Sequence, residues 1–474
     1  MKVSLVRSRL VLLALACLGA VVLAACGSDS GGSSDSAGGG SSSSTTAKTT
    51  ESSGGGGSTD ENGAALWAKG GSGKCGELEN FVDYVCGKPG EADPSLPPVK
   101  IGWVNNQDGS IVSLGPQATD AAQFAVDWVN KYASGIGGHK LELVKCYVKN
   151  SEEEGKACAD KFLADKDVHM ISYGAVGPGA NTINAAIKSA GIPVIEGFAL
   201  NVGDTQSNQH FILFTASPFD YYAWGTLGRD IMKAKTGAIV YPQGTGFQNN
   251  ARAAAEAMTA VGIKVKSVGF DPNSTNLVGA LVASGAQTAD MVVNIGGTPA
   301  TCVAINKGQK QLKIPDDKMV GDFSCALESE KEAYGGDIPG WIFGQAQSGD
   351  GLTDSPVGKQ YLAALTAFGH EKDRPDVWYS GMFGTLLTIA QTLNKVGPDK
   401  ITPDAIKAQI KQWRGPLLLG QPQPFCGKYP QAPANCGGGD RFFRYEGENK
   451  WKPLSEWSDV PIELQKKLGA KGVE

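Results

Sequence analysis

The sequence predicts an α/β protein in which parallel strands alternate with helices. Between Val99 and Glu196, short apolar runs suited to strands are separated by stretches with apolar residues at helical spacing. The same order of elements returns between Lys235 and Asp322, which indicates a second lobe rather than an extension of the first sheet. Glycine-bearing loops follow several of the strands, and binding sites in parallel sheets lie at those carboxyl ends.

The first lobe begins with the apolar run VKIGWV and a polar loop, NNQDGS. Ser151 and Glu154 form the pattern of a capping box, which predicts the start of a helix after the second strand. The turn GAVGPGAN follows the third strand and leads into another helix. The expected strands cover residues 99–104, 140–148, 168–173 and 191–197.

The second lobe repeats this pattern, with expected strands at residues 235–241, 263–270, 289–295 and 316–323. Residues 341–347 are expected to cross back to the first lobe. Three further helices are predicted over residues 355–369, 377–397 and 402–413, the last with Thr402 as N-cap and Pro403 at its first position. A closing hairpin with Gly447 in its turn is expected after residue 440.

The first 25 residues have the pattern of a signal peptide, with a basic start and an apolar run from Leu10 to Leu23. Leu23-Ala24-Ala25-Cys26 resembles the bacterial lipoprotein signal motif, which implies that the Cys26 thiol accepts the lipid. A plain signal peptide with an incidental cysteine is the alternative. Residues 26–62 are rich in Gly, Ser and Thr, so we expect a disordered tether. Residues 63–98 form an N-terminal extension of unassigned role.

The formal net charge of −5 argues against nucleic-acid binding, because nucleic-acid binders carry concentrated basic patches. Eight cysteines follow residue 62, and their close spacing predicts four local disulfides, although the sequence alone does not fix the connectivity. A metal site is not expected, since there is no C-x-x-C motif and the four histidines are scattered. The expected pairs are Cys75–Cys86, Cys146–Cys158, Cys302–Cys325 and Cys426–Cys436.

Several segments together resemble the type I periplasmic binding proteins, specifically the leucine/isoleucine/valine-binding receptors of ABC transporters. They include VKIGWVNNQDGS, IPVIEGFA, IVYPQGTGFQNNA, ADMVVNIGG and DVWYSGMFGTLLTIAQTLNKVG. The resemblance implies two lobes that are joined by three hinge crossings and bind a ligand between them. By that pattern, residues 99–217 and 347–413 form lobe 1, and residues 218–346 and 414–474 form lobe 2.

The resemblance also implies that loops at the strand ends touch the ligand. The hydroxyls with which the family's amino-acid binders hold a carboxylate are missing here, because the positions are Ala175-Val176-Gly177 and Phe198-Ala199-Leu200. Backbone N–H groups would then have to hold a carboxylate, and Asp322 would meet an ammonium group. Each aromatic residue among the candidates has core packing as its alternative role. The expected ligand-binding residues are Asn106, Asp108, Tyr173, Val176, Gly177, Phe198, Ala199, Asn201, Thr245, Phe247, Thr298, Asp322 and Phe323.

These observations favour a lipid-anchored receptor that delivers a small molecule to an ABC importer. The ligand classes considered are amino acids, related amides, carboxylates and aromatic compounds. A sensor that uses the same two lobes to address a signalling partner is the alternative. An enzyme is not expected, because no G-x-S-x-G, H-E-x-x-H or paired-carboxylate signature falls at the strand ends. The expected partners are a small ligand, the permease subunits and the membrane through the lipid, with no cofactor and no nucleic acid.

Overall fold

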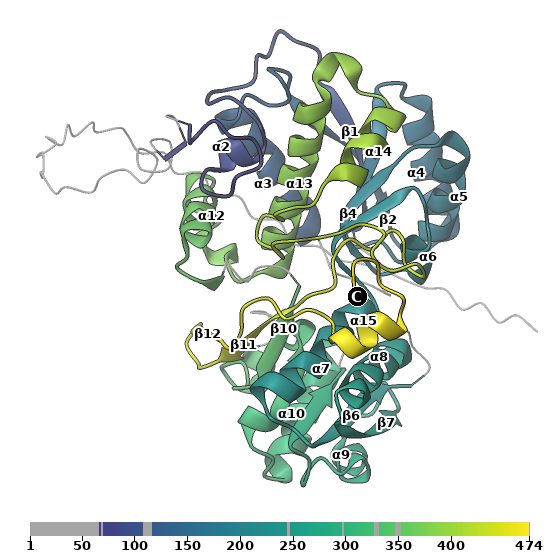
Figure 1. Ribbon diagram of the computed structural model, residues 1–474, viewed down its shortest axis with the longest axis vertical. Helices are drawn as coiled ribbons and strands as arrows, with labels where there is room; N and C mark the ends of the chain where they lie inside the picture. Colours follow the sequence, from purple (N-terminus) through teal and green to yellow (C-terminus); the bar gives the residue numbers. More distant parts are fainter. Residues whose placement is uncertain are drawn as a thin grey trace, which may run out of the picture. The chain divides into compact units, whose positions relative to one another are not determined.

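The computed structural model describes residues 66–67, 70–107, 116–243, 247–295, 298–326, 331–346 and 352–473. Within these ranges the strands form two separate sheets with helices around them (Figure 1). The expected α/β class is therefore confirmed. No helix in the described ranges combines the length and the apolar character that a membrane crossing needs.

The first sheet, as far as it is described, has five parallel strands in the order β2-β1-β3-β4-β5. The last six residues of β1 are all buried, as expected for a parallel strand covered on both faces. The strands are β1 (Val99–Asn106), β2 (Leu141–Val148), β3 (Val168–Tyr173), β4 (Val194–Ala199) and β5 (His210–Ala216).

Helices from two distant parts of the chain surround this sheet, and α3 and α13 lie side by side (Figure 1). Two predicted helix starts are confirmed, since Ser151 and Glu154 form a capping box and the Thr402 side chain accepts from Ala405 N. The helices are α2 (Phe81–Tyr84), α3 (Gln117–Tyr132), α4 (Glu152–Ala164), α5 (Ala180–Ala190), α6 (Val202–Thr205), α12 (Pro356–Ala367), α13 (Val377–Val396) and α14 (Pro403–Gln412).

The second sheet, over the described residues, has seven strands in the order β12-β11-β10-β9-β8-β6-β7. Strands β6 to β10 pair in parallel, whereas β11 and β12 form the predicted antiparallel hairpin at one edge. The strands are β6 (Thr236–Pro242), β7 (Lys264–Phe270), β8 (Met291–Asn294), β9 (Met319–Asp322), β10 (Ile342–Gln345), β11 (Arg441–Tyr445) and β12 (Trp451–Pro453).

The helices near this sheet are mostly shorter than those of the first. The 3₁₀ segment η1 follows directly on the last strand of the first sheet. The elements are η1 (Phe219–Ala223), α7 (Trp224–Thr226), α8 (Phe247–Ala260), α9 (Val278–Ser284), α10 (Pro299–Gln311), η4 (Phe323–Ala326), α11 (Lys331–Tyr334) and α15 (Ile462–Lys467).

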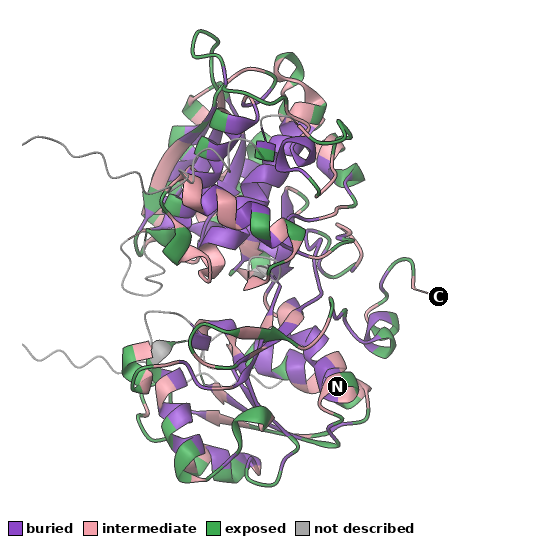
Figure 2. Ribbon diagram, turned by 90° about the vertical axis from the view of Figure 1, so that its left-hand side faces the viewer, coloured by how far each residue is buried: buried purple, intermediate pink, exposed green. Residues whose placement is uncertain are grey.

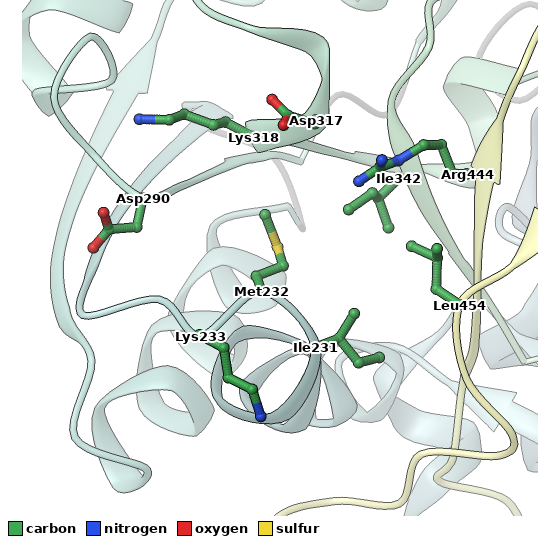
Figure 3. A pocket seen from close by; sticks show the side chains of 9 residues that line it. All are labelled: Ile231, Met232, Lys233, Asp290, Asp317, Lys318, Ile342, Arg444 and Leu454. Carbon is green, nitrogen blue, oxygen red and sulfur yellow. The ribbon is translucent and has the colours of Figure 1, made fainter.

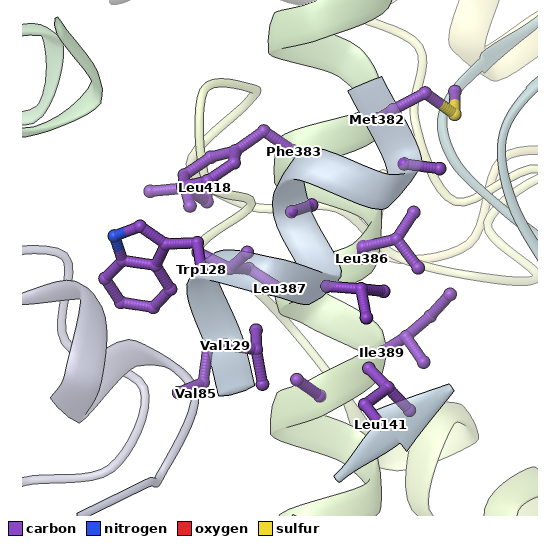
Figure 4. Close-up of a cluster of buried hydrophobic side chains, with 14 of the residues drawn as sticks. Val85, Trp128, Val129, Leu141, Met382, Phe383, Leu386, Leu387, Ile389 and Leu418 are labelled. Atoms are coloured by element: carbon purple, nitrogen blue, oxygen red, sulfur yellow. The ribbon is translucent and has the colours of Figure 1, made fainter. Parts of the chain in front are cut away.

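A large apolar core joins α3, α13 and the N-terminal extension (Figure 4). Trp128 of α3 stands edge-on to Phe383 of α13, with ring centroids 5.9 Å apart. Trp67 and Phe81 from the extension also contact Trp128, at 5.3 Å and 6.0 Å between centroids. The extension is therefore part of the first core. Figure 2 shows that buried residues fill the interior while exposed ones follow the outer helix faces.

Three details differ from the sequence-based expectations. Strand β5 was not expected, and all seven of its residues are buried. Residues 342–345 form strand β10 of the second sheet, so the passage between sheets begins only after Gln345. Lobe 2 was predicted to resume at Arg414, but Leu417, Leu418 and Leu419 are buried in the first core because they pack against α13 and its neighbours.

All four predicted disulfides are confirmed. The pairs are Cys75–Cys86, Cys146–Cys158, Cys302–Cys325 and Cys426–Cys436. The two cysteines of each pair are 10 to 23 positions apart in the sequence, so each disulfide closes a short loop. The third fastens α10 to η4, which directly follows the carboxyl end of β9.

Candidate functional site

The carboxyl end of β1 carries two buried asparagines that bind the loops around them. The Asn106 side chain accepts a hydrogen bond from Gly177 N at 2.6 Å and donates one to Val148 O at 3.0 Å. Asn105 accepts from Ala175 N at 3.1 Å and donates to Thr119 Oγ1 at 3.1 Å. Both side chains are 0% exposed, so the end of β1 is held by its own amide network.

This network changes what the loop after β3 offers a ligand. Backbone N–H groups of the strand-end loops were expected to hold a ligand carboxylate, yet in this loop those of Ala175 and Gly177 already donate to Asn105 and Asn106. A donor used in this way is satisfied and gains little from a second acceptor. A carboxylate held by these two N–H groups is therefore not supported.

The aromatic residues at the other ends of the first sheet are packed. Tyr173 is 1% exposed, and its hydroxyl donates to Asn184 Oδ1 at 3.1 Å inside the lobe. Phe198 stacks on Phe214 with centroids 5.3 Å apart, and it also meets Trp378 at 5.8 Å. Phe198 is only partly buried, whereas Tyr173 is a core residue.

Beyond β4, the chain turns into α6 through residues that differ in exposure. Ala199 is buried, Leu200 is 43% exposed, and the Asn201 side chain caps α6 by accepting from Gly203 N. Asn201 also donates to Asn181 Oδ1 at 3.2 Å. Of these residues, only Leu200 presents a large open surface.

The carboxyl end of the second sheet is acidic. Asp322 ends β9 and accepts hydrogen bonds from the Tyr221 hydroxyl and from Ser324 N. Burial raises the pKa of Asp220 to about 6, against the lowering effect of its hydrogen bond from Thr215 and with a further rise from Asp322. Burial also raises the pKa of Asp440 well above its usual range, and Asp220 and Asp322 add to that rise. The charged groups that act on these carboxyls are thus other carboxyls.

Other polar atoms near this edge have no hydrogen-bond partner among the described residues. They include Asn294 Oδ1 at the end of β8 and Ser324 Oγ after β9. Buried polar atoms are normally paired, so unpaired ones near a strand end are consistent with a ligand-contacting surface. Thr298 caps α10 with Thr301, Phe247 starts α8 and is partly buried, and Phe323 is 8% exposed.

The carboxyl ends of the two sheets meet at η1. Thr215, at the end of β5 in the first sheet, donates to Asp220 Oδ1 at 2.6 Å. The next residue, Tyr221, donates to Asp322 at the end of β9 in the second sheet. Two side chains of one short segment therefore connect both edges, and we take this junction as the candidate binding region.

The chain matches the family model described as periplasmic binding protein over residues 98–425. That match covers more than half of the chain. The chain belongs to the periplasmic binding protein family. Members of this family are solute-binding proteins, and the two mostly parallel sheets described above agree with its type I fold. A search of curated proteins finds no match to this sequence.

Solved structures with the same fold bind chemically different ligands. A branched-chain amino acid transporter substrate-binding protein from Streptococcus pneumoniae, in complex with isoleucine, has a TM-score of 0.58 and 18% identity, covering 75% of this chain and 99% of its own. A solute-binding protein from R. palustris, in complex with 4-hydroxybenzoate, has a TM-score of 0.61 and 17% identity, covering 77% and 98%. A fatty acid ABC transporter substrate-binding protein from Thermomonospora curvata has a TM-score of 0.61 and 15% identity, covering 81% and 97%.

Some predicted residues of this periplasmic binding protein cannot be placed, since Asp108, Thr245 and Cys26 lie outside the described residues. Sequence reasoning missed Asp220, Tyr221 and Asp440, which come to the candidate site from the segments that pass between the sheets. It also missed Asn105, although two consecutive asparagines at the end of a buried strand were a usable signal.

A cavity of about 380 Å³ lies at the other end of the second sheet (Figure 3). Its lining includes Asp290 and Lys318, which directly precede β8 and β9, and Arg444 of β11. These positions are at the amino ends of the parallel strands. We place the candidate site at the carboxyl ends, because ligands bind there in open parallel sheets.

Proposed function

We propose that this periplasmic binding protein is a lipid-anchored receptor that captures a small molecule and delivers it to an ABC importer. The observation that carries the proposal is the family match over residues 98–425. The ligand is held between the carboxyl edges of the two sheets, and contact with both edges favours the closed state through its differential affinity.

The acidic edge of the second sheet narrows the ligand class. The negative charge of Asp322 raises the pKa of Asp220, and the charges of Asp220 and Asp322 raise the pKa of Asp440. A ligand that brings only negative charge to this edge would be repelled, whereas an ammonium group or an amide N–H would be attracted. We therefore favour an amino acid or a related amide, with the aromatic surface of Phe198 or Phe247 against its apolar part.

A thermal-shift screen of the unliganded protein tests this proposal. The screen compares amino acids and amides with aromatic acids and fatty acids of similar size, and titration calorimetry follows each hit. We expect saturable one-to-one binding of a compound that carries a cation or an N–H donor. Binding of carboxylates alone would contradict the ligand class, and conversion of the bound compound in a turnover assay would contradict a receptor without catalysis.

The lipid anchor is proposed from the sequence motif around Cys26. The Cys26→Ala variant is expected to lose metabolic lipid labelling and to leave the membrane fraction, since lipid chains on that thiol would hold the protein there. The matched control is Cys17→Ala, which removes a cysteine from the apolar run of the signal. Lipid labelling that persists in Cys26→Ala would refute the assignment.

A further inference from the structure

A second polar cluster lies inside the first lobe, away from the acidic edge. Glu196 of β4, Asp204 of α6 and His210 of β5 are buried at 1%, 0% and 1% exposure. One ligand atom from each residue lies within 4.8 Å of the other two. Residues 14 positions apart in sequence meet here because β4 and β5 are neighbouring strands and α6 contacts both.

Within the cluster, the His210 imidazole is the only side chain that can carry a positive charge, while Glu196 and Asp204 can each carry a negative one. His210 Nδ1 lies 2.7 Å from Glu196 Oε1, and its Nε2 lies 2.9 Å from Asn184 Oδ1. Asn184 Nδ2 donates to Asp204 Oδ1. The other oxygen, Asp204 Oδ2, has no hydrogen-bond partner in the described part of the chain, although the residue is fully buried.

Burying two carboxylates away from water is costly unless their charge is compensated. A single imidazole can compensate at most one of them. The unpartnered oxygen of Asp204 then remains the least satisfied atom of the cluster, and a cation would satisfy it directly.

We propose that Glu196, Asp204 and His210 bind a divalent transition-metal ion of the Zn²⁺ type. One imidazole nitrogen and two carboxylate oxygens are a donor set that suits Zn²⁺, and the side-chain oxygen of Asn184 is within reach of the same cluster. The ring nitrogen of His210 that binds the metal exchanges its present hydrogen bond for the metal bond.

The place of this cluster in the fold suggests a structural role for the metal. Asp204 is part of the four-residue helix α6, whose cap residue Asn201 directly follows the candidate ligand loop at the end of β4. Gly203 and Gln206, which flank the buried Asp204 and Thr205, are exposed. A metal ion can therefore reach the cluster when α6 moves away from the sheet, without any change in the strands. Once bound, it ties α6 to β4 and β5.

Equilibrium dialysis with Zn²⁺, followed by elemental analysis, tests the proposal on the full chain after it has been stripped with EDTA. We expect about one tightly held Zn²⁺ per chain and a higher melting temperature in its presence, because a ligand bound only to the folded state stabilises it. Asp204→Asn and His210→Gln should each weaken Zn²⁺ binding more than about 100-fold, beyond the usual effect of losing an outer partner.

The matched control is His370→Gln, which removes a histidine from a partly buried pair with Asp373, at 3.1 Å between Nδ1 and Oδ2. This variant should keep its Zn²⁺. The absorption spectrum of the Co²⁺-substituted protein distinguishes two kinds of site. A site of nitrogen and oxygen ligands lacks the thiolate charge-transfer bands that binding by Cys17 or Cys26 would give.

Asp204→Asn keeps the size of the side chain and an oxygen that can accept from Asn184, so it should fold even if His210→Gln does not. Zn²⁺ retention that is equal in the wild type and Asp204→Asn would overturn the proposal. So would the absence of tight Zn²⁺ binding by the folded wild-type chain, or a cobalt spectrum dominated by thiolate bands.

Discussion

The carboxyl edges of the two sheets use their polar groups in opposite ways. At the first edge, Asn105, Asn106 and Thr119 satisfy one another and the adjacent backbone, and all three are buried. At the second edge, Asp322 raises the pKa of Asp220, and both raise that of Asp440, while Asn294 Oδ1 and Ser324 Oγ have no hydrogen-bond partner among the described residues.

This difference indicates a division of roles within the candidate site. A saturated amide network fixes the shape of the first edge and offers few free donors to a ligand. Unpaired oxygens and clustered carboxyls at the second edge are costly in the empty protein, and a ligand with donors or positive charge relieves that cost. We therefore expect substitutions at the first edge to affect stability most and those at the second edge to affect binding most.

The largest effect is expected for Asn106→Ala. This change leaves Gly177 N–H without its acceptor, at about 1–3 kcal/mol, and removes one of the two donors to Val148 C=O, at about 0.5–1.5 kcal/mol, because Gln107 N still donates to that oxygen at 3.2 Å. The free energy of unfolding should therefore fall by about 1.5–4.5 kcal/mol. Urea unfolding measures the loss. Gln123→Ala is the control, since Gln123 bonds only to its surface neighbour Asp127 among the contacts described and should change stability by less than about 0.5 kcal/mol. Equal losses in the two variants would remove the contrast between the edges.

The second prediction compares one phenylalanine from each edge. Phe198→Ala removes a ring stacked on Phe214 and should lower the free energy of unfolding by about 2–3 kcal/mol. Phe247→Ala, at the start of α8, should lower it by roughly 1 kcal/mol, because Phe247 packs only partly against its core.

Ligand affinity should show the opposite order for these two variants. If the Phe247 ring covers the ligand, its loss should weaken binding roughly 5- to 150-fold, as 1–3 kcal/mol of lost apolar contact implies. Melting curves without ligand and calorimetric titrations with the screened ligand provide the two measurements. An unchanged affinity in Phe247→Ala would remove that residue from the site.

Much of the fold was predictable because parallel strands and covering helices have distinct periods. Strand β5 was missed for a physical reason, since HFILFTA is buried throughout and shows neither alternation nor helical spacing. The disulfide pairs were predictable because each closes a short loop, and the capping residues Ser151 and Thr402 were visible as local patterns.

The candidate site was less predictable, because its residues meet through topology. Tyr221 and Asp322 are 101 residues apart, and Trp224 and Asp440 are 216 apart, so no local pattern joins them. Tyr173 was correctly placed at the end of β3, yet its side chain points to Asn184 of α5 because successive side chains of a strand alternate between faces. Sequence indicated which loops lie at the edge but not which way their side chains point.

A smaller effect, confined to binding, is expected for Asp322→Asn. The variant keeps an acceptor for Ser324 N, so the fold should be preserved, but a ligand cation or N–H would lose a charged partner. Hydrogen bonds to charged groups contribute about 1.5–3 kcal/mol, which corresponds to roughly 10- to 150-fold weaker binding.

Asp317→Asn is a matched control, because Asp317 is an exposed aspartate just before the same strand, at its amino end. If both variants bind alike in calorimetry, the second edge does not select for charge.

The smallest effect is expected for the pH dependence that Asp220 brings to the acidic edge. Burial raises its pKa from 3.8 to about 6, so between these values the folded protein keeps a proton that the unfolded chain has released. The stabilising effect of that proton is complete below pH 4 and is lost as the pH rises through 6.

Asp220→Asn removes this titration, and its side-chain oxygen can still accept a hydrogen bond from Thr215. A pKa rise from 3.8 to about 6 corresponds to about 3 kcal/mol, and solvent screening lowers this because Asp220 is only partly buried. The variant should therefore gain about 1–2 kcal/mol relative to the wild type between pH 4 and pH 7. Urea unfolding across this range measures the gain, with Asp317→Asn as the variant whose stability should follow the wild-type curve. A gain that is independent of pH would mean that Asp220 is ionised at all these values, and the second edge would then differ from the first in hydrogen bonding alone.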